Sequence, residues 1–110
     1  MNPLHEAQNA LQHYCSNVIL MLEQALEGYC NATMKQEKET VFMDIKKYSS
    51  RLALLEPFYG SNGDTTQASQ LKKLCILLGH ENYQENSEEQ ILLLTKIFRL
   101  LAQLPASASR

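Results

Sequence analysis

The fold of this chain is decided by residues 11–55, which read LQHYCSNVILMLEQALEGYCNATMKQEKETVFMDIKKYSSRLALL. Before Thr33, apolar side chains recur at steps of three, four or seven: Leu4, Leu11, Cys15, Val18, Leu22, Ala25 and Tyr29. After Thr33 the ladder restarts in a new phase, at Val41, Ile45, Tyr48, Leu52 and Leu55. Such steps keep side chains on one face of an α-helix. Two consecutive helices are therefore predicted, each of which buries its own apolar stripe.

Start and stop signals extend this pattern to four helices, over residues 3–30, 34–56, 65–78 and 88–104. The segments Thr33–Gln36 and Ser87–Gln90 both fit a capping box, in which the first and last side chains bond each other's backbone N–H. Pro57 is expected to end the second helix and to begin a loop that runs to Gly63. The break at residues 31–33 is compatible with a full reversal or with a kink. Because short connections favour antiparallel neighbours, we predict an all-α four-helix up-and-down bundle or a close variant.

Length and composition indicate one globular unit. With 110 residues, of which 45% are apolar and 20% charged, the chain suits a single bundle domain over residues 1–104 and a flexible tail over 105–110. The net charge of -2 offers no general attraction to nucleic acid. No secretory signal is visible, and no apolar run approaches the roughly 20 residues needed to cross a membrane. An odd number of cysteines, three, indicates reduced thiols and a cytoplasmic protein.

No motif with a defined chemistry is present. Cys15 and Cys75 have apolar neighbours in the helical pattern and are expected in the core, whereas Cys30 is expected to be partly exposed. The histidines lack the spacings that common metal sites use. The glycine-containing segment 60–66 lacks the lysine of a phosphate-binding loop. We therefore predict no catalytic, cofactor-binding or metal-ligating residue, and we expect a protein that is not an enzyme.

The helix surfaces suggest where a partner could bind. The outer side of the first helix is poor in charge, and interface centres are depleted in charged residues. In the fourth helix the apolar stripe covers about half the cylinder, so this helix should touch two neighbours, or one neighbour and a partner. Scattered exposed apolar residues are also common on ordinary solvated helices. The candidate partner-binding residues are Leu20, Asn17, Gln24, Leu92, Met43 and Leu54.

These sequence patterns are compatible with two functions from different classes. The first is a non-enzymatic protein-binding bundle, such as an adaptor, an export-type chaperone or a regulator, that docks a partner through apolar helix faces. Its partner is another protein or a second copy of the chain in a homodimer, with no nucleic acid or membrane involved. The alternative is a ligand- or metal-binding helical bundle, with an enzyme as one form of it.

Overall fold

The structure is a computed structural model that describes residues 3–59 and 65–104. Within these residues the elements are α1 (Pro3–Asn31), α2 (Lys35–Leu54), α3 (Glu56–Tyr59), α4 (Thr65–Gly79) and α5 (Glu88–Ala102). No strand occurs in these two segments. The predicted all-α class is confirmed. The tail over 105–110 and residues 60–63 of the predicted loop lie outside the described residues.

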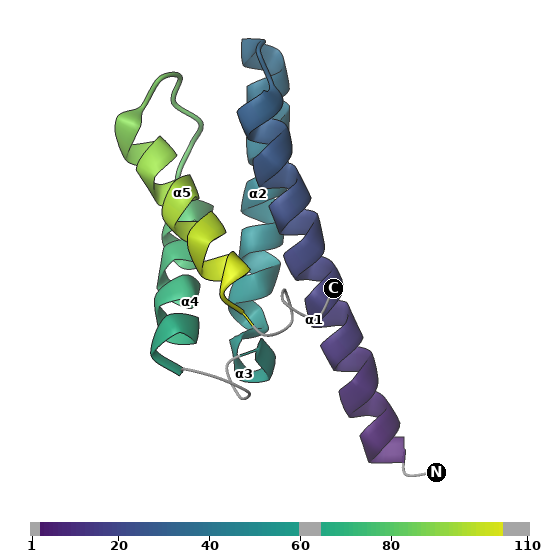
Figure 1. Cartoon of the computed structure of the whole chain (residues 1–110). Coiled ribbons are helices and arrows are strands. Elements are labelled where there is room, and N and C mark those ends of the chain that lie inside the picture. The colour runs from purple at the N-terminus through teal and green to yellow at the C-terminus, as the bar shows by residue number, and fades with distance from the viewer. Residues whose placement is uncertain (1–2, 60–64, 105–110) are drawn as a thin grey trace.

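The helices are arranged up and down (Figure 1). The chain reverses fully over residues 32–34, so α2 returns antiparallel along α1, and a kink at this point is excluded. α4 packs against α2, and α5 packs against both α4 and α1. The four long helices thus close a ring in which α1 and α5 are neighbours although they lie at opposite ends of the chain.

One apolar core runs through this ring and contains most of the predicted ladder. α1 contributes Cys15, Val18, Ile19, Leu22 and Leu26, and α2 contributes Phe42, Ile45, Leu52 and Ala53. α4 contributes Ala68, Leu71, Cys75 and Leu78, and α5 contributes Leu93, Leu94, Ile97 and Leu101. Burying one large apolar side chain contributes about 1.5–3 kcal/mol, so this shared core holds the helices together.

The N-terminal half of α1 departs from the prediction that the whole ladder is buried. Leu4 is 66% exposed and Leu11 is 38% exposed, and Tyr14 is exposed as well. Figure 1 shows the reason, because the N-terminal end of α1 extends beyond the other described helices. The helical periodicity was predicted correctly there, but burial also requires a neighbouring element.

Two of the predicted boundaries also need correction. α2 begins after Met34, which is its N-cap and makes no side-chain capping bond, so the capping box at Thr33 does not form. Pro57 does not start an irregular loop but lies in the first turn of the short α3. A proline is tolerated in the first turn of a helix, where its missing N–H would have no intrahelical partner.

Candidate partner-binding groove

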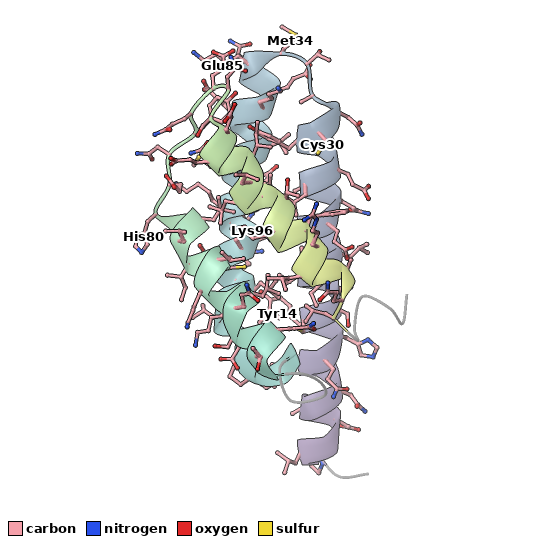
Figure 2. All side chains as sticks on the ribbon, turned by 60° about the vertical axis from the view of Figure 1, so that its left-hand side comes forward. Tyr14, Cys30, Met34, His80, Glu85 and Lys96 are labelled. Carbon is pink, nitrogen blue, oxygen red and sulfur yellow. The ribbon has the colours of Figure 1, made fainter. Side chains whose placement is uncertain are left out.

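An apolar groove of about 390 Å³ lies between the C-terminal part of α1 and α5. The residues that line it are Leu26, Glu27, Tyr29, Cys30, Asn31, Ile91, Leu94, Thr95 and Phe98. On α5 the lining runs from Ile91 to Phe98, which is about 10 Å, or two helical turns, at 1.5 Å per residue. Cys30, which is labelled on α1 in Figure 2, belongs to this lining.

The groove exists because the apolar stripe of α5 is broader than the surface that its neighbours cover. Leu94, Ile97 and Leu101 are buried in the core. Ile91 and Phe98 lie at the edge of the same stripe and remain 50% and 36% exposed. Large apolar side chains that border a concave site are typical of binding surfaces.

Three aromatic rings support the α1 wall of the groove. Tyr29 packs against Phe42 and Tyr83, with 6.4 Å between ring centroids in both pairs. Phe42 and Tyr83 meet edge to face at 5.7 Å. Burial raises the pKa of the Tyr29 phenol, and the neighbouring Tyr83 raises it further, so this phenol stays neutral at physiological pH. Aromatic pairs at these distances add about 0.5–1.5 kcal/mol each, so Tyr29 is held in place.

A buried amide holds the loop that leads into α5. The Gln84 backbone N–H donates to Oε1 of Gln90 at 3.0 Å, and Nε2 of Gln90 donates to the Asn82 carbonyl at 2.5 Å. Tyr83, which packs in the aromatic cluster, lies between these two loop residues. Gln90 thus ties the loop, and the start of the α5 wall, to the core.

The same glutamine explains why the second predicted capping box forms only in part. Ser87 is the N-cap of α5, and its Oγ accepts a hydrogen bond from the Gln90 backbone N–H at 3.3 Å. The Gln90 side chain bonds the loop at Gln84 and Asn82. The N-cap is therefore as predicted, whereas the side-chain partner of Gln90 is not.

The two walls of the groove differ in charge. Over its 29 residues α1 contains no lysine or arginine, and none of its last-turn residues is basic. Glu27 is exposed and lines the groove, and Glu23, one turn earlier, is 8% exposed. On α5 the lining residues Ile91, Leu94, Thr95 and Phe98 carry no charge. Glu27 is therefore the one charged residue in the lining of this groove, and it lies on the α1 wall.

The thiols follow the predicted distribution. Cys30 is exposed in the groove, while Cys15 and Cys75 are buried. Burial raises the pKa of the Cys15 thiol and raises that of Cys75 to about 12. Both buried thiols therefore stay protonated and unreactive near neutral pH.

The candidate residues from the sequence do not meet in one place. Leu92, Met43 and Leu54 are exposed, Asn17 and Gln24 are also exposed, and Leu20 is half-buried. None of the six lines the α1/α5 groove. Leu54 borders a separate, more open depression between α2 and α4.

The sequence allowed for a groove beside the faces of Leu20 and Leu92 but did not single out Ile91 or Phe98, which belong to the broad apolar stripe of the fourth predicted helix. A signal was present, since the stripe of this helix is too broad for one neighbour. The pattern along a helix shows the width of an apolar face. It does not show which part of that face α1 leaves uncovered.

Other site types are not seen in the described part of the chain. No three His, Cys, Asp or Glu side chains described here gather as metal ligands would. Among the described helices, none combines the length and the hydropathy that a membrane span requires. Comparisons with protein-family models, with curated proteins and with solved structures find no match to this chain.

Proposed function

We propose that this chain is a non-enzymatic protein-binding bundle whose α1/α5 groove receives an apolar helix of a partner protein. The observation that carries the proposal is the pair of exposed side chains, Ile91 and Phe98, at the edge of a groove lined mostly by apolar residues. Recognition of a helix in a groove uses apolar anchors at helical spacing. A groove two turns long suits anchors at positions i, i+3 or i+4, and i+7.

An adaptor, an export-type chaperone or a regulator would each use such a groove. The proposal includes a cytoplasmic location, because three unpaired cysteines suit a reducing compartment. It includes neither nucleic acid nor a membrane as partner, since the net charge is -2 and the exposed apolar residues border a groove suited to one helix.

The test is affinity purification from the native cell with wild-type protein, Phe98→Glu and the matched control Leu92→Glu. Leu92 is an exposed leucine of the same helix that lies outside the groove. We expect the wild type and the control to recover at least one common partner. Phe98→Glu should reduce the recovery of this partner about tenfold or more, because partner binding would desolvate the new carboxylate in the groove. Ile91→Glu is a second groove variant, and circular dichroism confirms that each variant is folded.

Two results would contradict the proposed site. Loss of partners with Leu92→Glu but not with Phe98→Glu would move the site to the outer face of α5, as the sequence suggested. Equal recovery by all variants would exclude both surfaces.

A small apolar ligand is the second candidate occupant, because 390 Å³ lies within the range of about 300–1,000 Å³ that small-molecule sites show. Native mass spectrometry of the purified protein distinguishes this function. A bound mass that disappears in Phe98→Glu would support it, and the unliganded mass alone would support the protein-binding function.

A further inference from the structure

The charge of the α1 wall restricts which helix can occupy the groove. We infer that the partner is an amphipathic helix with lysine or arginine on the flank of its apolar stripe that faces α1. This inference rests on the proposed function, because it describes the occupant of the same groove.

The first argument is the absence of any basic residue on α1. Glu27 lines the groove and is exposed, and α1 contains no lysine or arginine from Pro3 to Asn31. A helix seated beside α1 would place its flanking side chains within reach of the Glu27 carboxylate. A basic flank would gain from this proximity, and an acidic flank would be repelled.

The second argument comes from the position of the groove along α1. The lining on α1 runs from Leu26 to Asn31, which is the C-terminal end of the helix. Aligned peptide dipoles place a partial negative charge at a helix C-terminus, where cations are favoured. The last turn of α1 contains no basic residue, so α1 itself does not balance this potential. Lys38 of α2 approaches this end of α1, with its Nζ 5.9 Å from the centre of the Tyr29 ring.

The same charges argue against a second copy that inserts its own α1. The exposed stripe at Leu4 and Leu11 is the obvious apolar candidate from another molecule. Its helix would bring Glu6 and no lysine or arginine toward Glu27. A partner helix of opposite charge is therefore favoured over self-association through α1.

The experiment selects binders from a library of stapled helical peptides with fixed apolar residues at i, i+4 and i+7 and Lys, Glu or Gln at the flanking positions. The targets are wild-type protein, Glu27→Lys, Glu39→Lys and the groove variant Phe98→Glu. Glu39 is an exposed glutamate on α2 that lies outside the groove lining, so its reversal is the matched control. Glu27→Lys should fold, because a lysine near a helix C-terminus is favourable.

We expect lysine to be enriched at one flank on wild-type protein and on Glu39→Lys, and this preference to be lost or reversed on Glu27→Lys. For a selected lysine-flanked peptide, Glu27→Lys should raise the Kd about two- to fivefold at low ionic strength, as befits an exposed charge pair. The difference should shrink as salt is added.

The possible failures can be told apart. Binders that need Phe98 but show no preference for lysine, or prefer glutamate, would overturn the inference and leave the groove as the binding site. Binders that are all insensitive to Phe98→Glu, or no binders, would overturn the proposed function as well. Light scattering gives the third outcome, because a dimer of the 12.5 kDa chain that Phe98→Glu dissociates would make a second copy the occupant.

Discussion

The C-terminal half of α1 makes two interfaces of different kinds. Toward α2 the interface is closed, with Phe42 fully buried and in contact with the ring of Tyr29. Toward α5 it is open, with Phe98 partly exposed beside the groove. Both interfaces contain a phenylalanine on an amphipathic helix. The difference shows that an apolar face stabilises the fold only where a neighbour covers it, and that an uncovered part is available to a partner.

The largest expected effect comes from truncating these two phenylalanines. Phe42→Ala should lower the free energy of unfolding by about 3–5 kcal/mol, because it leaves a cavity in the closed interface. Phe98→Ala should cost about 1 kcal/mol, since its side chain already meets solvent. Urea denaturation followed by circular dichroism measures both values. Equal losses would mean that the two interfaces do not differ in packing.

A smaller effect is expected at the amide that holds the α5 end of the open interface. Gln90→Ala removes the bonds to Gln84 and Asn82 and should lower the free energy of unfolding by about 1–3 kcal/mol. The control is Gln103→Ala, because the amide of Gln103 makes an exposed hydrogen bond to Gln67. Amide hydrogen exchange should also become faster in residues 80–87. Identical stability of the two variants would show that Gln90 does not anchor the loop.

The smallest perturbation is chemical labelling of the thiols, which leaves the sequence unchanged. Cys30 in the open groove should react rapidly with a thiol reagent, because it is exposed. Cys75 should stay protected up to alkaline pH, because its pKa is raised to about 12. A peptide bound in the groove should slow the labelling of Cys30. Rapid reaction of all three thiols in the folded protein would contradict the core described here.

Much of the fold followed from local patterns. The buried part of the ladder on α1, Cys15–Val18–Leu22, and the cap at Ser87 could be read directly, because helical period and N-cap chemistry are local properties. The cap predicted at Thr33 failed, since α2 begins after Met34. Whether Leu4 is covered depends on the length of the neighbouring helices, and no residue near Leu4 in the sequence encodes that length.

The sequence by itself determined the helical class, the approximate positions of the four long helices and the side of each helix that is apolar. These properties depend on residue spacing within about one or two turns. Only the tertiary structure decided that α5 stands beside α1 with Ile91 and Phe98 at an open edge, and that Glu27 faces that edge. The physical reason is that burial and electrostatic potential depend on which segments become neighbours in space, and here α1 ends at Asn31 while α5 begins only at Glu88.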